Sequence, residues 1–306
     1  MSEAQDPSRL VSSGWAFYLA GNMRGAQRDF RAALAISPDD VQALVGLVQT
    51  QMALNQLADA DEAAARLLKI APTLAQAHRV QGEVLRRRRR LGGAEEHVRE
   101  AIRLDPADPL GYHYLAVIQY EQKQYRDALR TVEQGRTIAP DYAVLAAQKA
   151  LILLQLKGPR AAEPFADEAL RLRGDDSYVL VNVARVMLLR NKLGKARDLL
   201  EEVLRRDAND EDAISLYLLT DPQRYRLLRL RAQFGSWRKD HGLLGWIAWM
   251  AAWVLIAAAL IAAAVAGRVP AIVLAVGYQL FWRMQYAGHR RQVKRHFAQP
   301  QLKPGF

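Results

Sequence analysis

Cysteine is absent from this chain of 306 residues, which excludes disulfide bridges, thiolate nucleophiles and cysteine-ligated zinc. Metal-ligand spacings such as HExxH are absent as well, and no glycine-rich phosphate loop or isolated carboxylate pair can be found. His78, His97 and His113 are expected to lie in different units or on different faces of the fold. We therefore expect no enzyme, no metal, no cofactor and no small-molecule substrate.

Most of the chain carries no net charge. Residues 1–220 carry 30 basic and 30 acidic side chains, whereas residues 221–306 carry 13 basic and 2 acidic ones. The net charge of +11 therefore lies entirely in the C-terminal part. A nucleic-acid binder is expected to concentrate basic side chains on its folded binding surface. The distribution argues against nucleic acid as a partner.

What the sequence does contain is a strict repeat. Pro38, Pro72, Pro106 and Pro140 are each 34 residues apart. A period of this length is typical of stacked helical hairpins, which build binding surfaces and rarely catalytic pockets. When each unit is numbered so that its proline is position 32, six units begin at Pro7, Val41, Ala75, Pro109, Ala143 and Ser177.

Small residues recur where two helices must approach each other closely. Position 20 is alanine in all six units, and positions 8 and 27 are mostly glycine or alanine. A large side chain at these positions would hold the two backbones apart, whereas larger residues such as Phe30 fill the space between them. The alanines at position 20 are Ala26, Ala60, Ala94, Ala128, Ala162 and Ala196.

Acidic residues mark the starts of the first helices. A carboxylate at such a start can accept hydrogen bonds from free backbone N–H groups and meets the positive end of the helix dipole. The four aspartates that directly precede an expected first helix are Asp40, Asp108, Asp176 and Asp210. Residues 211–220 are expected to form a shortened seventh first helix that ends at Asp221-Pro222.

The combined pattern resembles the tetratricopeptide repeat (TPR) family over roughly residues 7–210. The resemblance implies a right-handed superhelix whose first helices line a concave groove for a peptide or a partner helix. Some members clamp a C-terminal carboxylate with a Lys/Asn/Lys/Arg set, which is absent here because Val11 and Trp15 stand at its first two positions. Positions 2, 5, 9 and 12 usually face the groove. In this chain they include Trp15, Tyr18, Gln49, Met52, Arg79, Glu83, Arg86, His113, Val117, Tyr120, Leu151, Asn182 and Arg185.

The most basic stretch of the repeats falls at positions 12–16 of the third unit, and it has two interpretations. Its cations can simply form a solvated turn that opposes the negative end of a helix dipole. Alternatively, they anchor an acidic peptide or lipid phosphates, because guanidinium groups bind such groups in a bidentate manner. The stretch consists of Arg86, Arg87, Arg88, Arg89 and Arg90.

Aromatic residues of the repeats are also assigned to two roles. Large amphipathic rings contribute strongly to binding at interfaces. On this ground Trp15, Tyr18 and Tyr120 are candidate anchors in the groove. The remaining tyrosines of the third and fourth units, Tyr112, Tyr114 and Tyr125, are expected to pack between helices.

Charge disappears completely between Leu243 and Gly267. This run of 25 residues exceeds the roughly 20 that cross about 30 Å of hydrocarbon. A second apolar stretch covers about 269–286, and basic residues flank the pair while the connecting turn has only Arg268. By the positive-inside rule both flanks stay in the cytoplasm, which predicts a transmembrane helical hairpin. One span followed by an interfacial helix remains the alternative.

The remaining segments are assigned by composition. Met1–Ser13 lacks the apolar core of a secretory signal, and arginine far outnumbers lysine, so we expect a bacterial inner-membrane protein whose repeats face the cytoplasm. Residues 223–234 are expected to cap the repeats or lie on headgroups, and Arg290–Phe306 is expected to be disordered. The predicted divisions are a flexible start (1–6), the solenoid of six repeats and a partial seventh (7–220), a basic juxtamembrane helix (221–242), the hairpin (243–286) and a basic tail (287–306).

The predicted fold is therefore all-α: a right-handed TPR-like solenoid followed by a C-terminal transmembrane helical hairpin. The expected function is that of a membrane-anchored, non-catalytic scaffold or assembly factor, which holds a protein or peptide partner in its groove at the cytoplasmic face. The alternative is an accessory or regulatory subunit of a membrane enzyme, transporter or secretion complex. In that case the partner would be contacted mainly through the hairpin.

Overall fold

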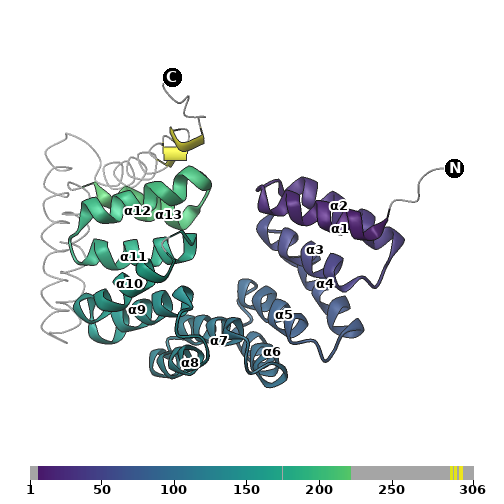
Figure 1. Ribbon diagram of the computed structural model, residues 1–306, viewed down its shortest axis with the longest axis horizontal. Helices are drawn as coiled ribbons and strands as arrows, with labels where there is room; N and C mark the ends of the chain where they lie inside the picture. Colours follow the sequence, from purple (N-terminus) through teal and green to yellow (C-terminus); the bar gives the residue numbers. More distant parts are fainter. Residues whose placement is uncertain (1–5, 174, 222–289, 292, 295, 299–306) are drawn as a thin grey trace, which may run out of the picture. The chain divides into compact units, whose positions relative to one another are not determined.

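The computed structural model describes residues 6–173 and 175–221, and near the C-terminus residues 290–291, 293–294 and 296–298. Every regular element in these ranges is a helix (Figure 1). The chain forms two compact units, residues 1–172 and residues 173–306. The predicted all-α repeat architecture is confirmed for the described ranges. Within them, no helix combines the length and the apolar character that a membrane crossing needs, and the predicted hairpin at 243–286 lies outside them.

Helices occur in pairs that follow the 34-residue repeat. In the first unit the first helices of the pairs are α1 (Pro7–Leu19), α3 (Val41–Ala53), α5 (Ala75–Arg87), α7 (Pro109–Glu121) and α9 (Ala143–Lys157). The second helices are α2 (Met23–Ile36), α4 (Leu57–Ile70), α6 (Leu91–Leu104), α8 (Tyr125–Ile138) and α10 (Pro159–Arg173). The second unit contains α11 (Ser177–Leu189), α12 (Leu193–Arg206), α13 (Glu211–Tyr217) and the 3-10 helix η1 (Leu218–Thr220).

Aspartate caps set the starts of the first helices, as predicted. The Asp40 carboxylate accepts a hydrogen bond from the Ala43 N–H at 2.8 Å, and Asp210 accepts from Ala213 at the same distance. Asp108 and Asp176 cap α7 and α11 in the same manner. Each cap satisfies an N–H group that would otherwise lack a partner at the helix end.

A residue with left-handed backbone follows the first helix in most pairs and turns the chain back for the second helix. Glycine or asparagine tolerates this conformation best, and Gly21, Asn55 and Asn191 take it with φ of 76°, 60° and 59°. In the third and fourth pairs the same place is held by Arg89 at 62° and Lys123 at 65°. Arg89 and Lys123 adopt this backbone conformation at a cost in conformational energy, because both carry a Cβ atom.

The small residues of the repeat lie where paired helices touch. All six alanines at position 20 are fully buried. A Cβ added at Gly82 would stand 2.5 Å from Val98 Cγ2 and 3.1 Å from the Ala94 carbonyl oxygen, so α5 and α6 are in contact through their backbones there. Phe30 fills the space between the first two pairs and is itself completely buried. The packing role assigned to these positions is confirmed.

The first helices form an inner layer. In the first unit α1 contacts α3, α3 contacts α5, α5 contacts α7, and α7 contacts α9, in addition to the contacts of each helix with the next along the chain. In the described part, the second helices of successive pairs meet little or not at all. Because helices on the inside of a curve lie closer together, the first helices line the concave side.

Near the C-terminus, the described residues are helical and contact α13 within the second unit. Lys294 Nζ lies 2.7 Å from Glu211 Oε1, and Arg290 also pairs with Glu211. The ring of Phe297 meets that of Tyr217 edge-on, with centroids 5.7 Å apart. The expectation of disorder from Arg290 onward is wrong for these residues, because α13 offers the basic segment a carboxylate and an aromatic ring.

Candidate functional site

Four first helices of the first unit contribute side chains to one shallow hollow. α1, α3, α5 and α7 each supply at least one lining residue, and the hollow has a volume of about 220 Å³. Five of its residues belong to the predicted groove, namely Tyr18, Gln49, Met52, Arg79 and Glu83. The others are Ala53, Val80, Arg87 and Tyr114.

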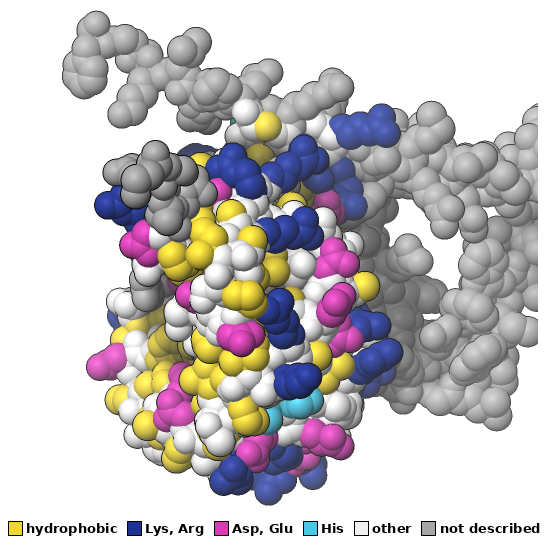
Figure 2. Space-filling view, turned by 90° about the vertical axis from the view of Figure 1, so that its right-hand side faces the viewer, with side chains coloured by type: hydrophobic (Ala, Val, Ile, Leu, Met, Phe, Trp, Pro, Cys, Tyr) yellow, Lys and Arg dark blue, Asp and Glu magenta, His cyan; other side chains and the backbone are white. Residues whose placement is uncertain are grey.

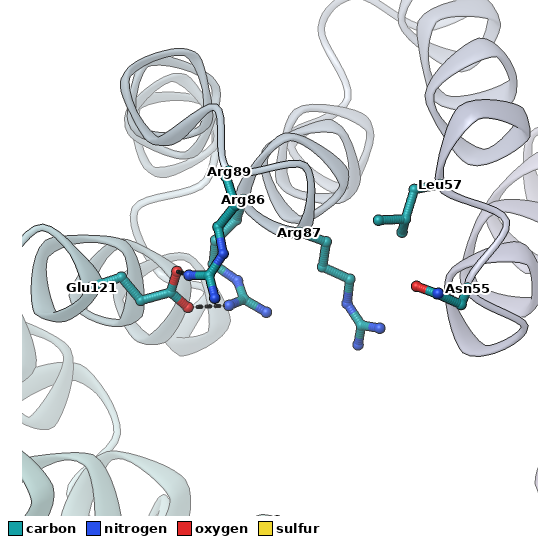
Figure 3. A pocket seen from close by; sticks show the side chains of 6 residues that line it. All are labelled: Asn55, Leu57, Arg86, Arg87, Arg89 and Glu121. Carbon is teal, nitrogen blue, oxygen red and sulfur yellow. Dashed lines mark hydrogen bonds and ion pairs between the residues drawn. The ribbon is translucent and has the colours of Figure 1, made fainter. Parts of the chain in front are cut away.

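A second hollow of about 290 Å³ adjoins the first, and Arg87 lines both. Figure 3 shows its side chains: Arg86 and Arg89 point toward Glu121, whereas Arg87 extends into the open space on the side of Asn55 and Leu57. We call these two hollows together the groove. It is lined by four arginines and two glutamates, so its net charge is positive.

Glu83 is the buried acid of the groove, and arginines occupy both of its carboxylate oxygens. Arg86 donates from Nε to Oε2 at 2.7 Å and from Nη2 to Oε1 at 2.8 Å, while Arg87 Nε donates to Oε1 at 3.0 Å. Burial raises the pKa of Glu83, but the hydrogen bonds and positive charges of Arg86 and Arg87 outweigh burial and hold the pKa below its usual value. Glu83 is therefore deprotonated at neutral pH, and its negative charge is balanced by Arg86 and Arg87.

The arginine stretch at the C-terminal end of α5 forms ion pairs across neighbouring repeats. Besides Glu83, Arg86 contacts Glu121, Arg88 pairs with Asp61, and Arg89 Nη1 lies 3.1 Å from Glu121 Oε2. The interpretation as a solvated turn is wrong for Arg86 and Arg88, since their partners lie on other helices and both side chains are partly buried. The interpretation as an anchor for an acidic ligand stays a prediction.

Arg87 links two repeats through the backbone. Its Nη1 donates to the Met52 carbonyl oxygen at 3.3 Å, near the C-terminal end of α3. A cation at this place satisfies a terminal carbonyl and interacts favourably with the negative end of the helix dipole. Arg87 thus has a structural role beside its place in the groove.

Arg79 is the most recessed cation of the first hollow, with 17% of its side chain exposed. Its guanidinium lies over the Tyr114 ring at 5.8 Å, and its Nε is 3.6 Å from Asp108 Oδ2. That Nε is buried and has no hydrogen-bond partner among the described residues. A buried donor without a hydrogen bond costs free energy, and the ion pair with Asp108 offsets part of that cost.

Tyr114 was missed by the sequence reasoning, which placed it between helices. Its ring does pack against the core cluster formed by α5, α6 and α7, but it also lines the hollow. Burial raises the pKa of the Tyr114 hydroxyl, and burial raises that of Tyr18 as well, so both hydroxyls keep their protons at neutral pH. The signal available in the sequence was its place directly after a predicted groove position.

His113 packs behind Tyr114, with ring centroids 5.3 Å apart. Desolvation lowers its pKa to about 4, Arg86 and Arg79 act in the same direction, and Glu83 opposes them. His113 is therefore neutral at physiological pH. It contacts the lining residue Tyr114 and is not among the side chains that line the hollows.

The remaining predicted groove residues lie outside both hollows. Trp15 packs edge-on against Phe30 with centroids 5.3 Å apart, and Tyr120 packs against Tyr125 at 5.3 Å. Leu151 is buried in the core, and Val117 is partly buried. Asn182 and Arg185 belong to α11 in the second unit, where Asn182 is buried and donates to the Tyr178 carbonyl.

Two histidines expected on different faces lie together. His78 Nδ1 is 3.2 Å from His97 Nδ1, and His78 Nε2 is 2.9 Å from the Pro72 carbonyl oxygen. Because a carbonyl only accepts, His78 carries its proton on Nε2 and accepts from His97. Figure 2 shows a small histidine patch among interspersed acidic and basic side chains. In the described part of the chain no group of three or more candidate ligands is placed to hold a metal ion.

Comparison with known proteins identifies the repeats. Models of the tetratricopeptide repeat family match residues 17–84 and 79–143. The chain contains tetratricopeptide repeats. Such repeats are generally protein-interaction scaffolds, typically without catalytic activity.

Solved structures share the fold at low sequence identity. A tetratricopeptide repeat protein from Parabacteroides merdae ATCC 43184 is similar with a TM-score of 0.61 and 14% identity, over 72% of this chain and 86% of that chain. A chain of the APC/C hetero-tetramer Cut9–Hcn1 is similar with a TM-score of 0.58 and 18% identity, over 72% of this chain and 44% of that chain. This chain thus spans less than half of the latter. Among curated proteins, none matches the sequence.

Proposed function

We propose that this protein is a membrane-anchored, non-catalytic scaffold whose tetratricopeptide groove holds a segment of a partner protein. The observation that carries the proposal is the convergence of side chains from α1, α3, α5 and α7 on one hollow. Met52 and Val80 provide apolar surface there, while Gln49, Arg79 and the two tyrosines offer polar groups. This combination suits an extended segment or a partner helix, whose side chains enter pockets and whose polar groups need partners.

The anchor is proposed from the sequence. The uncharged run Leu243–Gly267 and the apolar stretch at about 269–286 would cross the bacterial inner membrane as a hairpin. The contacts of Lys294 and Phe297 with α13 support an even number of crossings. Since both ends of the intervening segment belong to one packed unit, they lie on the same side of any membrane between them. That side would be the cytoplasm.

Anchoring has a physical consequence for capture. A groove held at the membrane surface meets membrane-bound partners at a raised effective concentration, provided that the linker to the anchor is long enough for the groove to reach the partner. A modest affinity of the groove would then suffice for stable assembly. This is the advantage of a scaffold or assembly factor over a freely diffusing repeat protein.

Site-specific photo-crosslinking in native membranes tests the proposal. A photoreactive amino acid at Gln49 in the hollow is expected to capture one discrete partner, identified by mass spectrometry. The same amino acid at Arg130, whose side chain is 79% exposed on α8, is the matched control and should give no such adduct. Equal adducts from both positions would contradict a binding role of the groove.

The same experiment distinguishes the scaffold from the alternative function, an accessory subunit that contacts its partner through the hairpin. Ala258, Ala262 and Ala266 recur at a spacing that favours close packing of membrane helices, within the hairpin or against another membrane protein. If the protein is an accessory subunit of a membrane enzyme, transporter or secretion complex, probes within 243–286 capture the partner and the probe at Gln49 does not. A partner captured from Gln49 after deletion of 243–306 favours the scaffold.

A further inference from the structure

We propose that the segment held in the groove is acidic, and that a carboxylate of the partner binds at Arg79 and Arg87 beside the hydroxyls of Tyr18 and Tyr114. This inference rests on the proposed binding function of the groove and adds the chemistry of its ligand. The occupant is a segment of a partner protein that carries aspartate or glutamate. It follows from the polarity of the lining, the recessed place of Arg79 and the charge of both hollows.

Every polar side chain that lines the first hollow, apart from Glu83, can donate a hydrogen bond. Gln49, Arg79, Arg87 and the two tyrosine hydroxyls can all donate hydrogen bonds. The single carboxylate, Glu83, has both oxygens occupied by Arg86 and Arg87. Gln49 and the two hydroxyls can also accept, but the guanidinium groups of Arg79 and Arg87 only donate and carry positive charge, and a carboxylate matches that pair best.

Arg79 supplies the most specific contact. Its Nε is buried without a hydrogen-bond partner among the described residues, and Asp108 remains 3.6 Å from it. The Arg79 side chain as a whole lines the hollow, so a carboxylate of the partner there would lie near its guanidinium. A guanidinium can also bind both oxygens of one carboxylate, whereas a lysine ammonium would act only as a point charge.

The charge of the groove has the required sign. Arg79, Arg86, Arg87 and Arg89 line the two hollows together with Glu83 and Glu121. The side chains of the two groove glutamates are 9% and 20% exposed, and both make ion pairs with arginines. An acidic segment is attracted to this surface, and a basic segment is repelled.

Recessed cations favour a protein segment over a lipid surface. Only 17% of the Arg79 side chain and 20% of the Arg86 side chain are exposed. A flat anionic membrane reaches protruding cations, but an extended chain can lower one side chain into a hollow between helices. The lipid phosphates considered for the arginine stretch are thus the less favoured source of the anion.

Peptide selection with the purified full-length protein in detergent tests the inference. The probe is a random library of eight-residue peptides displayed on phage, with the selected sequences synthesised and measured by fluorescence polarisation. Aspartate or glutamate is expected at one fixed position, and its replacement by asparagine or glutamine should weaken binding about tenfold or more. Selected peptides that are neutral or basic overturn the inference.

Variants assign the contact to Arg79. Arg79→Gln should weaken the acidic peptide about tenfold, and Arg79→Lys should restore binding only in part, because the charge returns without the planar fork. The matched control Arg130→Gln removes the same charge from the exposed surface of α8 and should leave affinity within about twofold. Circular dichroism and thermal unfolding confirm that each variant is folded. Acidic peptides that bind Arg79→Gln unchanged contradict the assignment.

The outcomes separate this inference from the proposed function. Neutral peptides whose binding is lost on Met52→Asp would leave the groove a binding site and overturn its preference for acidic ligands. If no peptide is selected at all, both fail. Binding of phosphatidylglycerol vesicles that requires Arg79, without binding of acidic peptides, would overturn the inference in favour of a lipid ligand.

Discussion

At the scale of single residues, burial behind the groove determines how stability responds to pH. His113 has a pKa of about 4 in the folded protein, against an ordinary value of 6.5. Between these values the unfolded chain binds more protons than the folded one, so stability rises with pH in this window. The contribution of His113 is complete above pH 6.5 and is lost as the pH falls toward 4.

We therefore predict that the protein loses about 2 kcal/mol of stability from His113 between pH 7 and pH 5. Chemical unfolding at the two pH values measures the loss, and His113→Gln should remove most of it. This range lies above the ordinary pKa of carboxyl groups, so carboxylates contribute little. His97, whose pKa is also lowered by burial and by His78, remains in both proteins as a common background. An equal loss in the variant would contradict the assignment.

Arg89 shows a second residue-scale effect, in the backbone. Its φ of 62° matches that of Asn55 and Asn191 at the same place in other repeats. Arg89→Asn should stabilise the protein by about 0.5–1 kcal/mol, because asparagine tolerates this conformation better. The lost ion pair with Glu121 contributes little, since the Arg89 side chain is 80% exposed. Asn55→Arg is the reverse control and should destabilise by a similar amount in thermal unfolding.

At the scale of helical elements, two glycines on one hairpin should respond to alanine in opposite ways. Gly82→Ala places a Cβ 2.5 Å from Val98 and 3.1 Å from a backbone oxygen, so α5 and α6 must separate. We predict that the free energy of unfolding falls by about 1–3 kcal/mol, because the steric cost outweighs the gain of about 1 kcal/mol in helix propensity.

Gly92→Ala on α6 is the matched control. A Cβ at Gly92 meets no atom within 4 Å, so only the helix propensity changes and the protein should gain about 0.5–1 kcal/mol. Denaturant unfolding of both variants measures the difference. A stabilised Gly82→Ala would show that the two helices have room to spare, contrary to the packing role of position 8.

For the helical elements, local features could be predicted from the sequence, whereas contacts between helices could not. Helix starts and close contacts could be predicted because capping and the 34-residue period are local properties. The pairing of Arg88 with Asp61 could not, since these residues are 27 positions apart and meet only through the stacking of repeats. His78 and His97 meet within one repeat, where the packing of α5 against α6 decides which side chains face each other.

The groove shows the same division. Five residues of the first hollow followed from family positions, whereas Tyr114 and Arg87 lie beside those positions and enter through the twist between neighbouring first helices. Trp15 is a residue type that often anchors a ligand, but its ring packs edge-on against Phe30 and against the core cluster instead. Composition therefore identifies candidate anchors, and packing selects among them.

At the scale of the whole molecule, the absence of cysteine makes the proposed topology directly testable. Single cysteines can be introduced at Asn209, at Arg268 and at Ala298 without background labelling. Asn209 and Ala298 are both exposed in the second unit, whose C-terminal residues contact α13. Arg268 is the only charged residue in the turn between the two apolar segments.

We predict that a membrane-impermeant maleimide labels Asn209→Cys and Ala298→Cys from one side of sealed vesicles and Arg268→Cys from the other. Two crossings place the turn opposite both flanks, whereas a single crossing followed by an interfacial helix places Arg268 and Ala298 on one side. Inverted and right-side-out vesicles measure each position from both faces, and permeabilised vesicles show that all three cysteines react. Labelling of Ala298→Cys and Arg268→Cys from the same face would exclude the hairpin. Because Phe297 and Lys294 contact α13, that result would also require these contacts to break in the membrane.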